Sequence, residues 1–426
     1  MNYQESIQYL YDLRQFGAKL GLDNVRSLAG KVGSPQDGLK FIHIAGTNGK
    51  GSTCAFLESI YRHAEYKTGL FASPHLVSFR ERLQVNHQLI SNKEVIALVT
   101  ELKPVLATFP RESHPTFFEV ITIMAFMHFR NSECDIVILE TGLGGRLDST
   151  NIITPLASGI TNIELDHQAW LGDTISEIAA EKAGIIKAGI PSFTCEEKPD
   201  ALSVIREVAN RQNSSLHTAH RDAIAKTRLL FKELPLPGEH QWKNATLARV
   251  IAEALFFNFP VPTDNLIQGL KNAHITGRFQ IIQRGTQTLV LDCAHNPAGV
   301  RAFCETLTQQ FPDQGASLIV GMLGDKETQS MCADLAGIAD LVQLLPVHSS
   351  RSASPESLKE AFQKAAPDLS VSIAEGIQEA LDDFQEAPLV AITGSIHFLG
   401  EVIEALGLEN LPNERALNEY GEKDKP

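Results

Sequence analysis

The chain has 426 residues, a formal net charge of -14 and 43% hydrophobic residues. This length predicts more than one domain, and the negative charge argues against nucleic acid or anionic membranes as partners because like charges repel. Neither a secretory leader nor a membrane-spanning run is visible, so we expect a cytoplasmic monomer that binds small molecules. The six cysteines are too dispersed for a disulfide framework or a zinc site.

Four apolar runs alternate with helical patterns in the first half of the chain, at 41–45, 69–72, 136–139 and 156–163. Near-continuous apolar strands between helices predict a parallel sheet that is covered on both faces. A polar cluster follows each run. Because ligands bind beyond the carboxyl ends of parallel strands, we expect the four clusters to converge on one crevice.

The first run leads into a glycine-rich loop, Gly46-Thr47-Asn48-Gly49-Lys50-Gly51-Ser52. Such a loop directs backbone N–H groups and one lysine toward a common point in front of a helix N-terminus, which is typical of phosphate binding. It departs from the standard phosphate loop, because Ile44 stands where that pattern needs glycine and Gly51 follows the lysine in place of a hydroxyl. A glycine turn with a solvated lysine is the less favoured alternative.

Glu140 ends the third apolar run, just before a second glycine-rich turn. A buried carboxylate needs a partner, and Mg²⁺ prefers carboxylate and phosphate oxygens, so Glu140 and the Ser73 hydroxyl form a candidate metal site. For Ser73 alone, a turn or helix cap before Pro74 is at least as good an explanation. His167 follows the fourth run, and a lone histidine is more often structural than a ligand.

Lys182 lies on the apolar face of a helix predicted over 174–187. Burial lowers the pKa of a lysine, and a neutral amine can combine with CO₂ to form a carbamate, which turns a buried cation into a metal-binding anion. The pattern alone favours the alternative, in which the stem packs and the ammonium reaches solvent. Phe117 and Phe118 begin another apolar helix, where they could stack on a flat heterocycle or simply join the core.

A second set of strands, each followed by a polar loop, predicts a smaller doubly wound domain in the last third of the chain. We place the first domain at 1–283, a linker at 284–287 and the second domain at 288–426. An anionic substrate in an acidic protein needs a local positive cleft. Candidates for that cleft include Lys326 and Arg351, for which a solvated surface role is equally supported.

These motifs in this order resemble the folylpolyglutamate synthase/dihydrofolate synthase family, relatives of the Mur ligases. The resemblance covers nearly the whole chain and rests on segments 45–52, 73–75, 139–148, 165–167, 181–185, 277–280 and 292–297. It implies an α/β fold in which a Mur-ligase-like P-loop ATPase domain with a mostly parallel sheet precedes a smaller Rossmann-like glutamate ligase domain. The active site would lie in the cleft between them.

The resemblance also implies roles for individual residues. Residues 46–52 would hold the ATP phosphates, with Lys50, Lys182 and His167 as catalytic residues. Of two Mg²⁺ ions, the first would be held by Ser73 and Glu140 and the second by His167 and a carbamylated Lys182. The remaining positions are nucleotide contacts at Asn244, Arg278, Asp292 and His295, and substrate contacts at Phe117, Phe118, Asp148 and Arg351.

The implied function is ATP-dependent amide ligation in folate biosynthesis and one-carbon metabolism. We hypothesise that L-glutamate is joined to dihydropteroate and also to the γ-carboxylate of tetrahydrofolate, in both cases through an acyl phosphate. The alternatives are folylpolyglutamate synthase activity alone, or an ATP-dependent regulatory module without ligase activity. A Mur-type enzyme is disfavoured, because the residues before Phe41 leave no room for a nucleotide-sugar domain.

Overall fold

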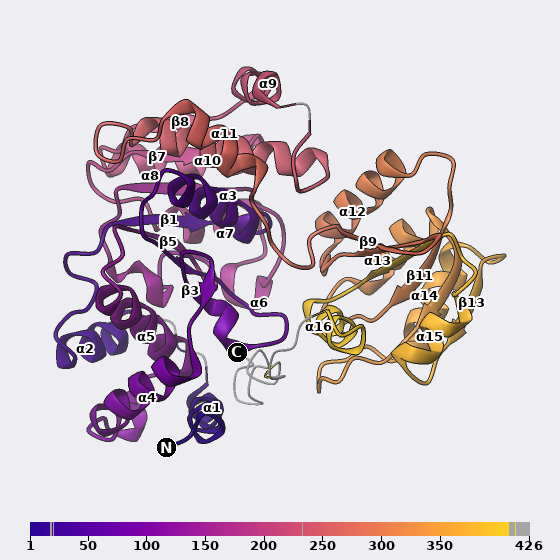
Figure 1. The fold of residues 1–426 in the computed structure, drawn as a ribbon, viewed down its shortest axis with the longest axis horizontal. Coiled ribbons are helices and arrows are strands. Elements are labelled where there is room, and N and C mark those ends of the chain that lie inside the picture. Colours follow the sequence, from indigo (N-terminus) through magenta and orange to yellow (C-terminus); the bar gives the residue numbers. More distant parts are fainter. Residues whose placement is uncertain (18, 20, 232, 409–413, 415–426) are drawn as a thin grey trace.

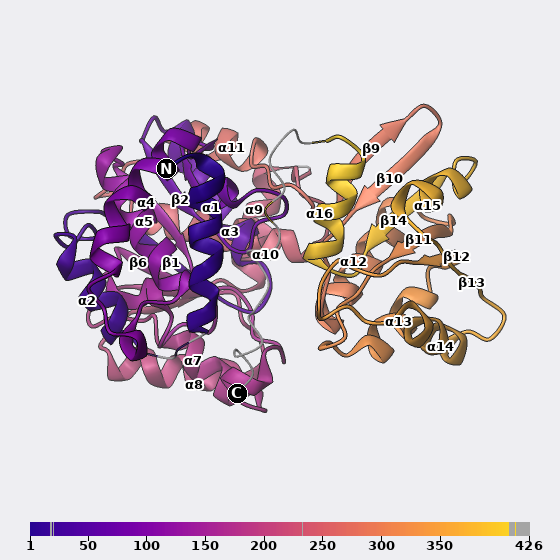
Figure 2. The same ribbon diagram turned by 90° about the horizontal axis from the view of Figure 1, so that it is seen from below.

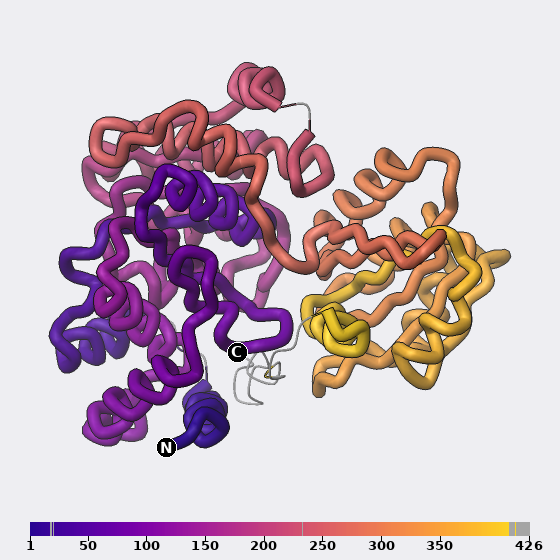
Figure 3. Tube along the Cα trace, in the orientation of Figure 1, coloured from indigo at the N-terminus to yellow at the C-terminus, as the bar shows by residue number. Residues whose placement is uncertain are grey.

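The computed structural model describes residues 1–17, 19, 21–231, 233–408 and 414. Within this part of the chain the strands form an eight-stranded and a six-stranded sheet, each in its own lobe (Figures 1 and 2). The tube in Figure 3 shows that the chain crosses to the second lobe after it has formed the helices of the first lobe. A search of the described helices finds none with the length and hydropathy needed to cross a membrane.

The first sheet has the strand order β4-β3-β2-β5-β1-β6-β7-β8. Its strands are β1 (Phe41–Ala45), β2 (Thr68–Phe71), β3 (Leu83–Val85), β4 (Gln88–Leu89), β5 (Ile136–Glu140), β6 (Ala157–Ile160), β7 (Ser192–Thr194) and β8 (Leu216–Thr218). The pairs from β2 to β8 are parallel, whereas β3 and β4 are antiparallel at one edge. The predicted parallel sheet is therefore confirmed.

Helices cover both faces of this sheet. They are α1 (Tyr3–Asp12), α2 (Asp23–Lys31), α3 (Lys50–His63), α4 (Asn92–Leu106), α5 (Phe117–Asn131), α6 (Gln168–Leu171), α7 (Ile175–Ala183), α8 (Pro199–Arg211), α9 (Arg221–Leu230), α10 (Glu239–Ala254) and α11 (Thr263–Lys271), with short 3₁₀ helices η1 (Leu13–Phe16), η2 (Phe79–Arg82), η3 (Arg111–Ser113) and η4 (Ser149–Ile152). Phe41 packs with α1, α2, α4 and α5, whereas Ile42 and Ile44 pack with α3, α10 and α11. The side chains of β1 divide in this way because successive strand residues point to opposite faces.

The second sheet has the order β13-β12-β11-β14-β10-β9 and is parallel except at β9. Its strands are β9 (Gln280–Arg284), β10 (Gln287–Leu291), β11 (Ala316–Val320), β12 (Ala339–Leu344), β13 (Ser370–Ile373) and β14 (Leu389–Thr393). One face packs on α12 (Pro297–Gln310), α13 (Thr328–Ala336) and α14 (Pro355–Ala365), and the other on α15 (Ile377–Asp383) and α16 (Ile396–Ala405). Alternating strands and helices produce this doubly wound layer structure.

The expected linker at 284–287 differs from the structure. Residue Arg284 of β9 pairs with Gln287 of β10, so these four positions form a hairpin turn inside the second sheet. Gly285 has a φ of 63°, a left-handed conformation that glycine adopts at little cost. A polar turn with glycine resembles a linker in sequence, but the chain already enters the second sheet at Gln280.

The helix that carries Lys182 is shorter than predicted. α7 begins after Thr174, whose side chain accepts a hydrogen bond from the Glu177 N–H in a capping box, and it ends at Ala183. Gly184 caps the helix, so the residues up to Lys187 lie beyond it. The predicted apolar face is nevertheless real, because Ile178, Ala179 and Lys182 are all buried.

Candidate functional site

A cleft of about 1020 Å³ lies between the two lobes. Its first-lobe walls are the loops that follow β1, β2, β5 and β6, as the strand pattern predicted. Its second-lobe walls include the loops that follow β10 and β11. All the predicted site residues line this cleft, in keeping with the rule that ligands bind at the carboxyl edge of parallel strands.

The glycine loop is preformed around the N-terminus of α3. Gly49 caps the helix with a φ of 81°, and a Cβ atom there would lie 2.4 Å from Oδ1 of Asn244 on α10. The Thr47 and Asn48 N–H groups donate to the main-chain and side-chain oxygens of Asn162, each at 2.8 Å. Lys50 Nζ donates to the carbonyls of Gly46 and Thr47, both at 3.1 Å. The loop and Lys50 are therefore gathered at the N-terminus of α3, the kind of position at which helices bind phosphate.

Glu140 lies at the end of β5, beside this loop. Its carboxylate is buried, and its Oε2 accepts a hydrogen bond of 3.2 Å from the Ser73 N–H. Burial raises the pKa of Glu140, although Lys50 acts in the opposite direction. A buried carboxylate next to a hydroxyl and a phosphate loop has the donor chemistry of a Mg²⁺ site, so these two residues fit the predicted first ion.

Lys182 lies beneath the same loop. Its side chain is buried, with 4% of the residue exposed, and Nζ donates to the Gly46 carbonyl at 2.8 Å. The alternative in which the ammonium reaches solvent is therefore wrong. Burial, and next the charge of Lys50, lowers the pKa of Lys182 to about 7. A large neutral fraction at neutral pH is the condition that carbamate formation needs.

His167 begins α6 in a left-handed conformation, with a φ of 51°. Burial lowers its pKa to about 4 despite the opposing charge of Asp166, so the imidazole is neutral at pH 7 and keeps a nitrogen lone pair. Among the described residues there is no group of three His, Cys, Asp or Glu side chains that could hold a metal. A second ion at His167 would therefore need a further ligand, which a carbamate on Lys182 or a phosphate oxygen would supply.

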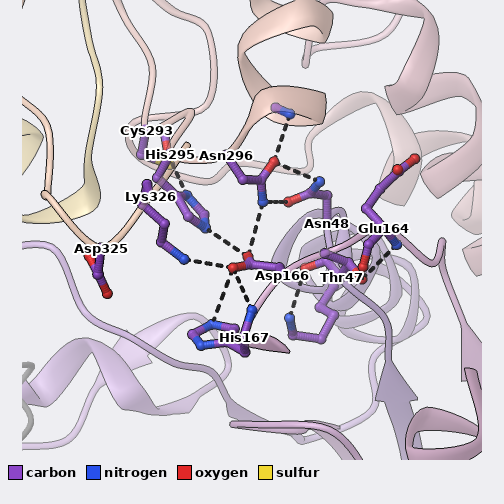
Figure 4. A network of polar contacts seen from close by, with 12 residues as sticks. Thr47, Asn48, Glu164, Asp166, His167, Cys293, His295, Asn296, Asp325 and Lys326 are labelled. Carbon is purple, nitrogen blue, oxygen red and sulfur yellow. Dashed lines mark hydrogen bonds and ion pairs between the residues drawn. The ribbon is translucent and has the colours of Figure 1, made fainter. Parts of the chain in front are cut away.

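Asp166 joins the two lobes, as Figure 4 shows. Lys326 Nζ and the Asn296 side-chain amide donate to its carboxylate at 2.6 and 3.2 Å. The ring nitrogens Nε2 of His167 and of His295 lie 4.0 Å from it. Burial alone would raise the pKa of Asp166, but His167, Lys326 and His295 together hold it well below its usual range.

One further pair of side chains binds across the cleft, and hydrogen bonds of His295 and Asp292 fix the opposite wall. The side-chain amides of Asn48 and Asn296 exchange hydrogen bonds of 3.2 and 3.0 Å, which ties the glycine loop to the start of α12. His295 Nδ1 bonds the Cys293 carbonyl at 2.9 Å, so Nδ1 carries the proton and Nε2 points toward Asp166. Asp292 accepts hydrogen bonds of 2.8 Å from the N–H groups of Phe279 and Ala294.

The predicted substrate residues also line the cleft. Phe117 and Phe118 are half-buried, so the core alternative accounts for only part of each ring. The Asp148 carboxylate is already occupied, because it accepts hydrogen bonds from the Leu143 N–H at 2.8 Å and the Thr150 hydroxyl at 2.5 Å. It therefore fixes the loop after β5. Arg351 lies 3.2 Å from the Asp325 carboxylate, at the second-lobe wall.

Three residues in this site had no role predicted from sequence. Asp166 lies next to His167 in the loop after β6, and its place beside a predicted site residue was an available signal. Asn296 is far from Asn48 in sequence, and only the docked lobes bring the two together. Arg82 lines the cleft with its guanidinium carbon 5.6 Å from the centre of the Phe117 ring, and it belongs to no glycine or histidine motif.

Comparison with known proteins agrees with this geometry. Residues 44–252 match the Mur ligase middle domain and residues 277–396 match the Mur ligase glutamate ligase domain. The dihydrofolate synthase/folylpolyglutamate synthase of Bacillus subtilis (strain 168) is 35% identical, over 95% of this chain and 99% of its own length. The chain belongs to the folylpolyglutamate synthase/dihydrofolate synthase family.

Solved structures of this family extend the match to three dimensions. Mycobacterium tuberculosis folylpolyglutamate synthase, complexed with ADP and AMPPCP, is 30% identical with a TM-score of 0.85, covering 95% of this chain and 99% of that one. Escherichia coli FolC in complex with DHPP and ADP is 30% identical with a TM-score of 0.82, covering 96% and 98%. The predicted fold and the ATP-dependent ligase class are therefore confirmed.

Proposed function

We propose that this member of the folylpolyglutamate synthase/dihydrofolate synthase family carries both activities. It joins L-glutamate to dihydropteroate, and it adds glutamate to the γ-carboxylate of tetrahydrofolate. The main support is the placement of the glycine loop, Glu140 with Ser73, and Lys182 with His167 around one cleft that Phe117 and Phe118 also line. The same cleft thus offers groups suited to a nucleotide phosphate and to an aromatic heterocycle.

The proposed chemistry has two steps. A carboxylate oxygen of the folate substrate attacks the γ-phosphorus of ATP, and ADP leaves, so the carboxylate becomes an acyl phosphate. The amine nitrogen of glutamate then attacks the acyl carbon; the carbon–oxygen bond to phosphate breaks and the nitrogen loses a proton. Activation is needed because hydroxide is a poor leaving group, and no side-chain nucleophile takes part.

The residues of the chain supply positive charge and orientation. Lys50 and the N-terminus of α3 face the phosphates, and their positions are fixed by the loop carbonyls and Asn162. Phosphoryl transfer depends mostly on this kind of positioning and charge stabilisation. Lys326 of the second lobe lies next to Asp166 of the first lobe, so it brings a second cation to the same cleft.

Ser73 and Glu140 have donor groups that suit a first Mg²⁺ ion, whereas a second ion at His167 also needs the proposed carbamate on Lys182. We assign the first to Ser73 and Glu140, and the second to His167 and a carbamylated Lys182. When bound, the ions would neutralise negative charge on the phosphate oxygens. Arg278, Asp292, His295 and Asn244 complete the proposed nucleotide contacts. We further propose that the protein acts as a cytoplasmic monomer.

The proposal is tested by incubating the protein with ATP, Mg²⁺, L-glutamate and either dihydropteroate or tetrahydrofolate, and by measuring products by mass spectrometry. We expect one added glutamate on dihydropteroate and one or more on tetrahydrofolate. Product from tetrahydrofolate alone would reduce the function to folylpolyglutamate synthase. ATP binding without any amide product would favour a regulatory module.

The acyl phosphate is tested separately with dihydropteroate labelled with ¹⁸O in its carboxylate. Attack on the γ-phosphorus leaves one carboxylate oxygen on phosphate, so inorganic phosphate should carry one ¹⁸O atom for each amide formed. Unlabelled phosphate would rule out this intermediate. The same assay on Glu140→Gln should show slower label transfer together with slower amide formation.

A further inference from the structure

A closed loop at residues 72–82 connects β2 to β3 and carries site residues at both ends. The Ala72 N–H donates to the Arg82 carbonyl at 3.1 Å, and Phe71 pairs with Leu83 in the antiparallel register beyond it. Ser73, the proposed Mg²⁺ ligand, lies just after the neck of the loop, and Arg82 closes it. The two ends of the loop therefore line different parts of the cleft, Ser73 beside Glu140 and Arg82 beside Phe117.

The middle of this loop packs in the second lobe. Leu76 and Val77 belong to an apolar cluster with Phe398 and Leu399 of α16. In Figures 1 and 2, α16 lies on the side of the second lobe that faces the first. A loop that starts and ends in the first sheet is thus anchored in the core of the other lobe.

Glu414, which follows α16 in the chain, binds this loop through four hydrogen bonds. Its N–H donates to the Val77 carbonyl at 2.8 Å. Its Oε2 accepts from the Ser78 hydroxyl at 3.1 Å and from the Phe79 N–H at 2.7 Å. The His75 ring bonds its carbonyl at 3.0 Å, and only 6% of Glu414 is exposed. A buried carboxylate that accepts a backbone N–H and a hydroxyl is a specific contact.

The His75 ring links Glu414 to Arg82, which lines the cleft, through two hydrogen bonds. Arg82 Nε lies 2.8 Å from His75 Nδ1, and an arginine N–H can only donate, so Nδ1 accepts. Nε2 must then carry the ring proton and donate it to the Glu414 carbonyl. His75 is buried, so this tautomer is fixed by its two partners. The guanidinium of Arg82 is held over the Phe117 ring as a result.

We propose that Glu414 is a positioning residue for the folate pocket. By docking on residues 75–79 it fixes the His75 tautomer and thereby the Arg82 guanidinium over Phe117, so a residue that follows the second lobe in the chain contributes to a pocket formed by the first lobe. The inference rests on the proposed function, because it assigns Arg82 and Phe117 to the folate substrate. The loop also has an internal partner, Glu81, whose carboxylate accepts the N–H groups of Leu76, Val77 and Ser78.

The test compares Glu414→Ala, Glu414→Gln and Ser78→Ala with Asp383→Ala as a control. Asp383 is a carboxylate of the second lobe that accepts a hydrogen bond from Gln343. Hydrogen–deuterium exchange of the peptide over 72–82 is measured without substrates. The KM for dihydropteroate and the KM for ATP are then measured in the ligase assay.

Glu414→Ala should speed exchange in this peptide and raise the KM for dihydropteroate about tenfold, the loss expected for one charged hydrogen-bond acceptor. The KM for ATP and the values for Asp383→Ala should stay within about twofold of the parent. Glu414→Gln should restore most of the loss, because an amide oxygen can accept both bonds that Oε2 accepts. Ser78→Ala removes the bond from the Ser78 hydroxyl to Glu414 and the 3.4 Å bond that this hydroxyl accepts from the Arg80 N–H, but it keeps the Phe79 and Val77 bonds to Glu414, so it should give an intermediate effect even if Glu414→Ala does not fold.

Unchanged exchange and an unchanged KM in Glu414→Ala would overturn the proposal and leave Glu81 as the residue that holds the loop. An equal rise in both KM values without rescue by glutamine would also overturn it, since that pattern marks general destabilisation. Absence of ligase activity in the parent protein would instead contradict the proposed function, and the exchange measurement would still decide whether Glu414 docks the loop.

Discussion

Lys326 of the second lobe donates a hydrogen bond of 2.6 Å to Asp166 of the first lobe, and both side chains are largely buried, with 13% and 8% exposed. The pair lies at the mouth of the proposed phosphate site, where His167 and His295 also face the Asp166 carboxylate. The Asp166 carboxylate holds the Lys326 cation of the second lobe close to the place where a phosphate group would bind.

Asp166→Asn should lower kcat/KM for the ligase reaction about 100-fold, because removing one partner of a buried ion pair leaves the other charge uncompensated. The amide keeps the size of the side chain, so folding should be retained. Steady-state kinetics check this, with Asp334→Asn as a control, since Asp334 pairs with Arg301 at 3.9 Å on the second-lobe surface. An Asp166 variant with parental activity would show that the pair has no role in turnover.

Lys182→Ala should abolish turnover, and acetate added to the variant should restore part of it by supplying a carboxylate in place of the carbamate. The direct readout is the carbonyl signal of ¹³CO₂-treated protein in NMR, which should be absent in Lys182→Ala and present in Lys187→Ala. The pKa of Lys182 is about 7, so the neutral amine and with it the carbamate signal should decline as pH falls below 7. Full activity in Lys182→Ala would exclude the carbamate.

Gly49→Ala should weaken ATP binding more than tenfold and lower the Tm. Its φ of 81° is unfavourable for alanine, and the added methyl would lie 2.4 Å from Asn244 Oδ1, so loop and helix would both have to move. Gly30→Ala is the matched control, because a Cβ there meets no atom within 4 Å and the position is inside α2. That variant should bind ATP normally and gain roughly 0.5–1 kcal/mol of stability. Equal affinities for ATP in the two variants would contradict the proposed loop function.

His43 should make the folded protein sensitive to acid. Burial lowers its pKa to about 3. Its Nε2 donates to the Thr150 hydroxyl, which itself donates to Asp148, while Nδ1 has no partner among the described residues. In the unfolded chain His43 is protonated below about pH 6.5, whereas in the folded protein it stays neutral down to about pH 3. The free energy of unfolding therefore falls as the pH drops from 6.5 to 3.

This difference in protonation makes the free energy of unfolding about 2 kcal/mol lower at pH 5 than at pH 7. His43→Gln removes the titrating group and can still donate to Thr150. Between pH 7 and pH 5 the free energy of unfolding of this variant should therefore fall by about 2 kcal/mol less than that of the parent protein. Urea denaturation at pH 7 and pH 5 measures both values. Identical pH slopes for the parent and the variant would contradict the proposed burial of a neutral imidazole.

The parallel strands and the polar loops that follow them could be predicted because each is encoded locally, by apolar runs and by glycine. The linker predicted at 284–287 is wrong for the same reason. Local composition does not distinguish a hairpin turn from a linker, and these residues form a hairpin turn. Lys182 illustrates the difference between what a local sequence pattern predicts and what tertiary contacts decide. Helical spacing placed it on an apolar face, but only the structure shows that Nζ ends at the Gly46 carbonyl and does not reach solvent.

The sequence by itself determined the α/β class, the phosphate loop and the order of the motifs, because short-range patterns of apolar residues, glycine and charge are sufficient for these. The tertiary structure decided which distant groups meet: Asn48 with Asn296, Asp166 with Lys326, and Glu414 with the loop that carries His75. The physical reason is that these contacts depend on how two separately folded sheets dock, and burial in that interface sets both their partners and their charge states.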